Sequence, residues 1–147
     1  EEMVRGEGPV HEWDTISRVA EAWGLQRTGS QIQARVREAI DDACSAGQIE
    51  RNGEFLSMQG KLARVRTRDG TGIPMERVAP AEVQVAVRRV LEVTGGAPRD
   101  ELIAAVRAVF GFQRTGAIIE NWIDRSVQAL IETKEVGEGP RGLALLR

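Results

Sequence analysis

The sequence predicts a mainly α-helical chain of the α+β class, arranged as two tandem winged helix-turn-helix domains. One observation is an internal repeat: the segment 23–29, WGLQRTG, returns 87 positions later as FGFQRTG over 110–116. Another is that apolar residues in both copies recur at helical spacing and are followed by a short hairpin pattern. With 147 residues, 41% hydrophobic and 29% charged, the chain suits one domain or two very small ones.

The repeat extends well beyond this segment, because the same offset also pairs apolar residues elsewhere. These pairs are Ile16 with Ile103, Val19 with Val106, Ile32 with Ile119, Val36 with Ile123, Ile40 with Val127 and Ile49 with Val136. Each copy is therefore expected to bury the same helix faces.

The first helix of the repeat is expected over 81–94 in the second copy, where Pro80 opens it and Gly95 and Gly96 end it. The first copy is expected to hold only the end of this helix, from Glu1 to about Arg5. Since the sequence also lacks an initiator methionine, this suggests a piece of a longer protein.

The second helix is expected from Glu12 to Trp23 and, in the second copy, from Pro98 or Arg99 to Phe110. Gly24 and Gly111 follow these helices, where a left-handed glycine commonly ends a helix. The aromatic residues at the two helix ends are expected in the core: Trp23 and Phe110.

The third helix is expected over 30–46, ended by Gly47. Thr28 is suited to cap its amino end and Gln31 completes a capping box, while Thr115 repeats the cap in the second copy.

A β-hairpin follows each third helix. In the first copy Asn52-Gly53 predicts a two-residue type I′ turn within 48–58. In the second copy a turn over 139–142 joins strands at 135–138 and 143–146. The resulting domains are 1–58 and 80–147, joined by a linker over 59–79.

The charge distribution separates these parts of the chain. The net charge is −2 overall, but it is −5 over 1–58, +3 over 59–78 and zero over 79–147. Strong nucleic-acid binders usually carry a marked basic excess, so this balance argues against tight, non-specific binding by the whole surface. Local contacts to DNA remain compatible with it.

Other classes of protein find no support in the sequence. With Cys44 and His11 as its single cysteine and histidine, the chain lacks an internal disulfide and a zinc cage, and we expect no metal or cofactor. His11 is expected at the surface or against a hairpin, and Cys44 in the core. Phosphate-loop, acidic Mg²⁺ and nucleophile-elbow motifs are absent, so we expect no catalytic residues. No apolar run is long enough to span a membrane and no signal segment is recognised, so a cytoplasmic protein is expected.

The doubled Gly-apolar-Gln-Arg-Thr-Gly motif, the VRTRD stretch over 65–69 and the PAEV stretch over 80–83 carry a resemblance that covers nearly the whole chain. The sequence resembles the uncharacterised domain at the C-terminus of large bacterial superfamily-one DNA helicase-like proteins. This resemblance implies an ATP-dependent DNA helicase as the parent protein, often with a nuclease-like domain nearby. The expected partners are the rest of that parent and DNA.

Contacts to DNA are expected from the first copy's third helix, whose counterpart in helix-turn-helix proteins enters the major groove, and from the basic linker. The candidates are Gln26, Arg27, Thr28, Ser30, Gln31, Gln33, Arg35, Arg37, Lys61, Arg64, Arg66, Arg68 and Arg114. In the alternative interpretation, the motif is a capped turn and the linker is either solvated or a clip onto the acidic first copy. Glu38, Asp41 and Asp42 would repel phosphate and oppose deep insertion.

The second copy's third helix is apolar on two sides. It has Ile118 and Trp122 at the positions of Gln31 and Arg35, so we expect these two to form a protein interface. The alternative is that Trp122 belongs to the core. The leading hypothesis is a non-catalytic accessory module that engages DNA through the first copy and the linker and docks through the second copy. The competing hypothesis is a protein-binding scaffold without nucleic-acid contacts.

Overall fold

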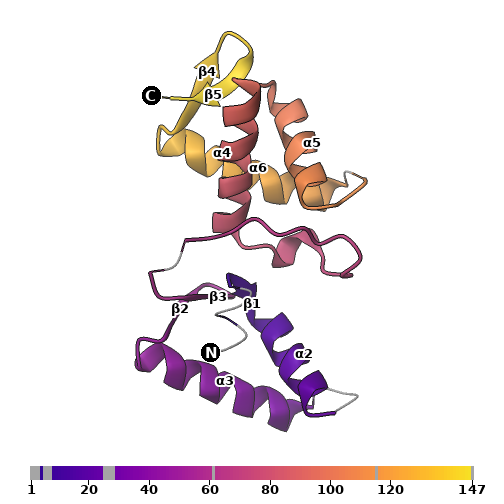
Figure 1. Cartoon of the computed structure of the whole chain (residues 1–147), viewed down its shortest axis with the longest axis vertical. Coiled ribbons are helices and arrows are strands. Elements are labelled where there is room, and N and C mark those ends of the chain that lie inside the picture. The colour runs from indigo at the N-terminus through magenta and orange to yellow at the C-terminus, as the bar shows by residue number, and fades with distance from the viewer. Residues whose placement is uncertain (1–3, 5–7, 25–28, 61, 115, 147) are drawn as a thin grey trace. The chain divides into compact units, whose positions relative to one another are not determined.

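The computed structural model describes residues 4, 8–24, 29–60, 62–114 and 116–146 (Figure 1). The described part is mostly helical with small antiparallel sheets, which confirms the predicted α+β class. It divides into two compact units, Glu1–Ala63 and Arg64–Arg147.

The first unit joins two helices to a small sheet. The helices are α2 and α3. The three-stranded antiparallel sheet has the order β1-β3-β2, because both outer strands pair with β3. The bounds are β1 Val10–His11, α2 Glu12–Ala22, α3 Ser30–Ser45, β2 Ile49–Asn52 and β3 Phe55–Met58. The core lies between these elements and includes Val4, Ile16, Val36, Ile40, Ile49 and Leu56.

The second unit has the same order with an additional long helix. Helix α4 packs against α5 and α6, and the β4-β5 hairpin lies at one end of α4 (Figure 1). The bounds are η1 Met75–Arg77, α4 Pro80–Thr94, α5 Arg99–Val109, α6 Ala117–Glu132, β4 Val136–Gly139 and β5 Gly142–Leu145. An isolated antiparallel bridge joins Ala97 to Leu143.

The repeat in the sequence is a repeat in the structure. Helices α2 and α3 and strands β2 and β3 each begin and end 87 positions before α5, α6, β4 and β5. Even the Ala97–Leu143 bridge has its counterpart, the pairing of Val10 with Leu56. The two units therefore share the order of these elements and the pairing of their strands.

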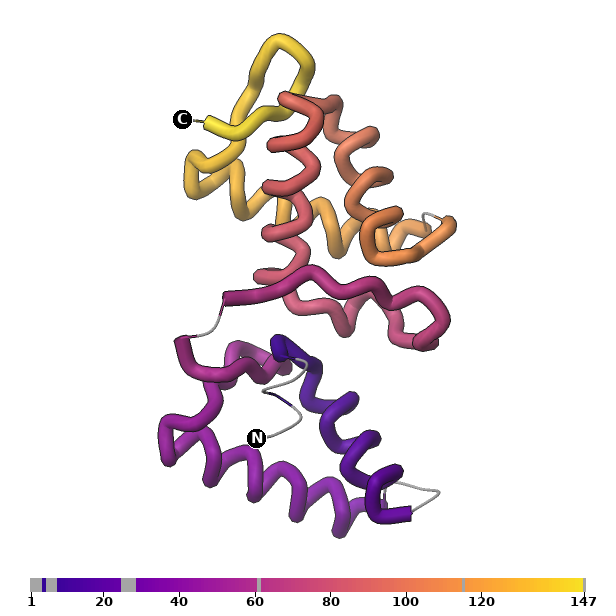
Figure 2. The backbone as a smooth tube through the Cα atoms, viewed as in Figure 1, coloured from indigo at the N-terminus to yellow at the C-terminus, as the bar shows by residue number. Residues whose placement is uncertain are grey.

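Residues 64–79, which we call the strap, differ from the predicted linker. They belong to the second unit, where the chain runs extended, turns back and enters α4 (Figure 2). Met75 and Val78 of the strap are buried in that unit's core and Val65 packs against it. The strap is therefore held by apolar contacts as well as by charge.

Several local expectations need correction. The N-caps of α3 and α6 are Gly29 and Gly116, neither with a side-chain cap, where Thr28 and Thr115 were expected; both threonines lie outside the described residues. In the first hairpin Asn52 pairs with Phe55, so the loop is Gly53-Glu54.

Of these hairpin loop residues, Gly53 alone has a positive φ, of 60°. That pattern matches a type II′ turn with glycine first, in place of the predicted type I′ turn.

The two helix-ending aromatic residues behave differently. Phe110 is fully buried, as predicted, whereas Trp23 is 58% exposed, so its expected place in the core is wrong. The left-handed glycines that follow them, Gly24 and Gly111, have φ of 74° and 85° and confirm the predicted helix ends. The difference in burial therefore does not come from the backbone at these positions.

Candidate functional site

The amino-terminal part of α3 carries the first group of predicted DNA contacts. Ser30, Gln31 and Arg35 are exposed there, and Gln33 is half-buried. The first turn of the helix contains no acidic residue. The first two turns of α3 therefore present exposed polar side chains without a carboxylate among them in the first turn.

Further along α3 the charges are used within the unit. Arg37 lies 3.8 Å from Glu12, and Arg51 of β2 donates to Glu12 Oε1 at 3.1 Å and to Asp41 Oδ1 at 2.7 Å. Partial burial acts to lower the pKa of Arg51, but attraction to Glu12 and Asp41 outweighs it and raises that pKa. Glu38 and Asp42 are exposed on the same half of the helix. This half of α3 presents carboxylates, and its arginine, Arg37, lies within ion-pair distance of Glu12.

Not all candidates are described. Gln26, Arg27, Thr28 and Lys61 lie outside the described residues. Arg64 and Arg114 are exposed in the second unit, in the strap and in the loop before α6.

Arg68 is 7% exposed and is used inside the second unit, which differs from its expected role at a DNA surface. Its Nη1 and Nη2 donate to Oε1 and Oε2 of Glu82 at 2.7 Å each, and its guanidinium lies 5.9 Å from the Phe110 ring centroid. Glu82, on α4, is fully buried. Arg68 thus fastens the strap to α4 of its own unit, a contact different from the predicted clip onto the first copy.

Arg66 contributes to the same buried ion pair. Its backbone N–H donates to Glu82 Oε1 at 2.8 Å and its guanidinium lies 3.9 Å from Glu82 Oε2. With Arg68, the strap surrounds one carboxylate with donors, an arrangement that stabilises a buried charge.

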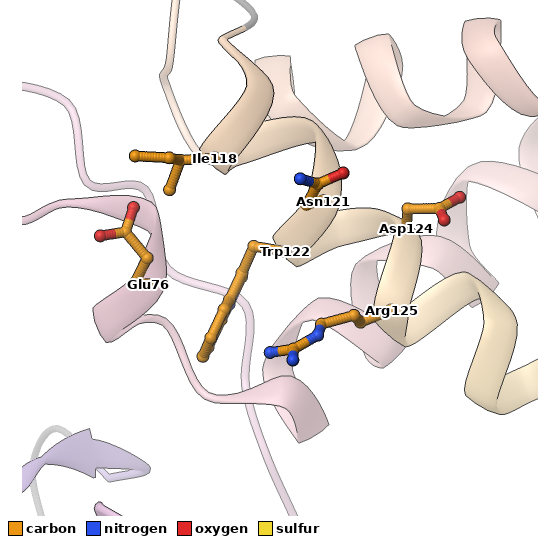
Figure 3. A pocket seen from close by; sticks show the side chains of 6 residues that line it. All are labelled: Glu76, Ile118, Asn121, Trp122, Asp124 and Arg125. Carbon is orange, nitrogen blue, oxygen red and sulfur yellow. The ribbon is translucent and has the colours of Figure 1, made fainter.

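The predicted interface residues lie at the rim of an open hollow of about 520 Å³ (Figure 3). Ile118 is 63% exposed. Trp122 is half-buried, packs against the core and donates from its indole Nε1 to Val78 O of the strap at 2.9 Å. The strap thus satisfies the polar atom of Trp122, while Ile118 keeps an exposed apolar surface beside it.

Charged groups stand on both sides of the indole. Trp122 projects between Arg125 and Glu76, and Glu76 lies on the same side as Ile118 (Figure 3). Arg125 also lines a smaller hollow of about 100 Å³ beside Pro80. Glu76 and Arg125 are exposed. Asp124, also in the lining, already accepts from Arg99 Nε at 2.6 Å, which leaves Glu76 and Arg125 as the charges that face the hollow.

Three further residues line the hollow and were not predicted from the sequence: Glu76, Asn121 and Arg125. A signal for two of them was present, because Ile118, Asn121, Trp122 and Arg125 follow the spacing of one helix face. Glu76 had no such signal, since its place depends on how the strap packs against α6.

His11 has the role expected for it. Its Nδ1 accepts from Trp13 N at 3.1 Å, so it caps α2, and its ring lies edge-on to Phe55 of the hairpin at 5.3 Å. Its Nε2 is 3.1 Å from Glu54 Oε2. Cys44 is half-buried against the first core, less enclosed than expected. In the part of the chain that the structure covers, no His, Cys, Asp and Glu group is arranged to hold a metal ion.

The chain is similar to one family of uncharacterised proteins over part of its length. A family model described as "Protein of unknown function (DUF3320)" matches residues 1–34, within the first unit. No curated protein and no solved structure matches the chain. None of the described helices is long and apolar enough to cross a membrane.

Proposed function

We propose that the chain is a non-catalytic docking module of a larger bacterial helicase-like protein, and that its second unit binds another segment of that protein beside Trp122. The observation that carries this proposal is the exposed Ile118 at the rim of a hollow on α6. An exposed apolar side chain next to a half-buried aromatic residue is typical of the centre of a protein interface.

The repeat supports this assignment by contrast. Ile118 and Trp122 stand where the first unit has Gln31 and Arg35, although the backbone elements around them begin and end at equivalent residues. The duplicated fold is therefore compatible with polar residues at both positions. Trp122 is accounted for by the core and the strap of its own unit, so it is the exposed Ile118 that is best explained by a contact with a partner.

The lining defines the chemistry of the partner segment. An aliphatic or aromatic side chain fits against Ile118 and Trp122, and a neighbouring carboxylate on the partner would pair with Arg125. A basic group at the opposite end would pair with Glu76. We therefore expect a short segment of the parent protein with an apolar anchor between an acidic and a basic residue.

Site-specific photo-crosslinking in the full-length protein that contains this chain tests the proposal. A benzophenone amino acid replaces Ile118 in one sample and Val93, an 88% exposed apolar residue on α4, in the control. Crosslinks mapped by mass spectrometry are expected from position 118 to a segment outside this chain, and not from position 93. Equal crosslinking from the two positions would reject the docking site.

A second candidate function is engagement of DNA by the first unit. The order helix, helix, hairpin is that of a winged helix-turn-helix domain, whose helix before the hairpin enters the major groove. The specific observation is that Arg35 and Gln31 lie exposed near the amino end of α3, in a stretch whose first turn has no acidic residue. This candidate implies weak, salt-sensitive contacts to the phosphate backbone.

Fluorescence anisotropy with duplex and forked DNA at low and moderate salt tests this second function. Arg35→Glu is expected to weaken binding and to reduce the salt slope by about 1, as for loss of one phosphate contact. Arg89→Glu, at an exposed position on α4, is the matched control and should not change binding beyond the effect of the added charge. Absence of binding by the folded wild-type chain at both salt concentrations would reject the DNA function.

A further inference from the structure

The smaller hollow beside Pro80 is lined by the start of α4 and the middle of α6, on the Arg125 side of Trp122 (Figure 3). Its apolar walls come from Pro80, Trp122 and Ala129. A volume of about 100 Å³ has room for several water molecules or for the end of one small side chain. This hollow is therefore suited to one polar group of a partner.

Three residues with hydrogen-bond donors line the same hollow: Gln84, Arg125 and Ser126. Ser126 is 3% exposed, and the surface that it keeps faces this hollow. Within the described part of the chain, none of these three side chains has a hydrogen bond or an ion pair. Buried polar groups in native proteins nearly always have a partner, so the hydroxyl of Ser126 points to an acceptor from outside the chain.

The first unit lacks these donors at the equivalent positions of α3. Ala39 stands there at the position of Ser126, and Glu38 at that of Arg125, although α3 and α6 begin and end at equivalent residues. Alanine is a better helix former than serine, so the helix itself gives no reason for Ser126. The donors therefore belong to the second unit alone and are not required by the repeated fold.

The lining favours a carboxylate over a neutral group. None of the residues that line the hollow is acidic, and no carboxylate of the described residues lies within ion-pair distance of Arg125. A carboxylate only accepts hydrogen bonds and takes several at once, and its bonds are stronger than those of a neutral acceptor. A carboxamide of the same shape would turn its own N–H groups toward some of these donors.

We propose that the smaller hollow is the specificity pocket for an acidic residue of the docked segment. Its carboxylate accepts hydrogen bonds from Ser126 Oγ and Gln84 Nε2 and pairs with Arg125. The inference rests on the proposed function, in which an apolar side chain of the same segment lies against Ile118 and Trp122. It adds Gln84 and Ser126, which do not line the larger hollow, as the residues that select aspartate or glutamate over the amides.

NMR titration of the full chain with sodium acetate tests the pocket by itself. Acetamide is the neutral control of the same shape, and sodium chloride controls for ionic strength. Acetate alone is expected to shift the Gln84 side-chain amide and Trp122 indole signals in a saturable manner.

Ser126→Ala should weaken acetate binding by about fivefold, as for the loss of one hydrogen bond, with an unchanged Tm. Ser45→Ala, at an exposed position of the first unit, is the matched control and should bind acetate like the wild type. Equal shifts by acetate and acetamide would overturn the inference, and so would equal acetate affinity of wild type and Ser126→Ala.

Crosslinking from position 118 in the full-length protein then tests the occupant. Gln84→Ala combined with Ser126→Ala is expected to lower the yield to the docked segment by at least about fivefold. Replacing the acidic residue of the crosslinked segment by its amide should give a similar loss. Glu132→Ala, at an exposed α6 position outside both hollows, is the control and should leave the yield unchanged.

The outcomes separate this inference from the proposed function. An unchanged yield in the double variant overturns the carboxylate pocket and leaves the docking of Ile118 in place. If position 118 gives no crosslink outside the chain even without these substitutions, the docking itself is wrong. The pocket then has no partner segment, and the inference falls with it.

Discussion

Single residues decide how the strap is held, and the ion pair of Arg68 with Glu82 is the clearest case. Glu82 is fully buried and accepts from both terminal nitrogens of Arg68 and from the backbone of Arg66. A buried charge that loses its partner is strongly destabilising, whereas an apolar pair of similar volume is often tolerated. The ion pair therefore fixes which residue of the strap lies opposite Glu82 on α4.

Arg68→Met is expected to lower the second unit's free energy of unfolding by about 3–5 kcal/mol, because the Glu82 carboxylate loses its principal donors. The double variant Arg68→Met with Glu82→Leu should recover most of that loss. Urea denaturation of the two singles and the double measures the coupling. Arg64→Met, at the exposed neighbouring position, is the control and should stay within about 0.5 kcal/mol of wild type. Additive losses in the double variant would contradict a coupled pair.

Individual secondary-structure elements were largely predictable from the sequence, because two copies of one pattern constrain each other. The bounds of α2, α3, α4 and α5 were predicted to within one or two residues from helical spacing and the glycines after each helix. Capping and turn type were predicted less well. Gly47 ends α3 with a φ of 73°, and its counterpart after α6 is Lys134 with a φ of 63°, a conformation that side-chain preference would not predict.

The two helix-ending glycines allow the contact between the strap and α5 to be measured separately from backbone strain. Gly24 and Gly111 share a left-handed backbone, but a Cβ at Gly24 meets nothing within 4 Å, whereas a Cβ at Gly111 approaches Thr67 Oγ1 and Asp69 Cβ at 2.8 Å. The same substitution at these positions therefore differs only in its contact with the strap.

Gly24→Ala is expected to cost about 1 kcal/mol, the typical strain of alanine in this conformation. Gly111→Ala should cost at least about 1 kcal/mol more, in the range found for overpacking. Chemical denaturation followed by circular dichroism compares the two variants. Hydrogen exchange of residues 64–79 should be accelerated only in the Gly111→Ala variant. Equal losses of stability in the two variants would show that the strap does not pack tightly against Gly111.

At the scale of the whole molecule, the duplication was predictable and the division between the units was not. Residues 59–79 were predicted as a basic linker between the two domains, yet the boundary lies at Ala63 and the strap belongs to the second core. Met75 and Val78 stand in an irregular segment, so no periodicity marked them as buried. The candidate site shares this limit, since Glu76 and the acceptor for Trp122 come from the strap, whereas Ile118 and Trp122 were predicted from α6 alone.

The position of this boundary determines which fragment of the chain is stable. A fragment of residues 64–147 is expected to unfold cooperatively with the stability that the second unit has in the full chain. A fragment of residues 80–147, cut at the domain start that composition suggested, loses the buried Met75 and Val78. It also leaves the Glu82 carboxylate without Arg68. Each lost apolar side chain is worth about 1.5–3 kcal/mol and the unpaired carboxylate about 3–5 kcal/mol, together comparable to the whole stability of a small domain.

We therefore expect the shorter fragment to lack a cooperative thermal transition and the longer one to retain it. Differential scanning calorimetry of both fragments and the full chain provides the measurement. An intermediate fragment that starts at Gly72 keeps the apolar residues but not Arg68 and should show a lowered but cooperative transition. If residues 80–147 unfold at the same temperature as residues 64–147, the strap adds no stability and the boundary at Ala63 has no energetic meaning.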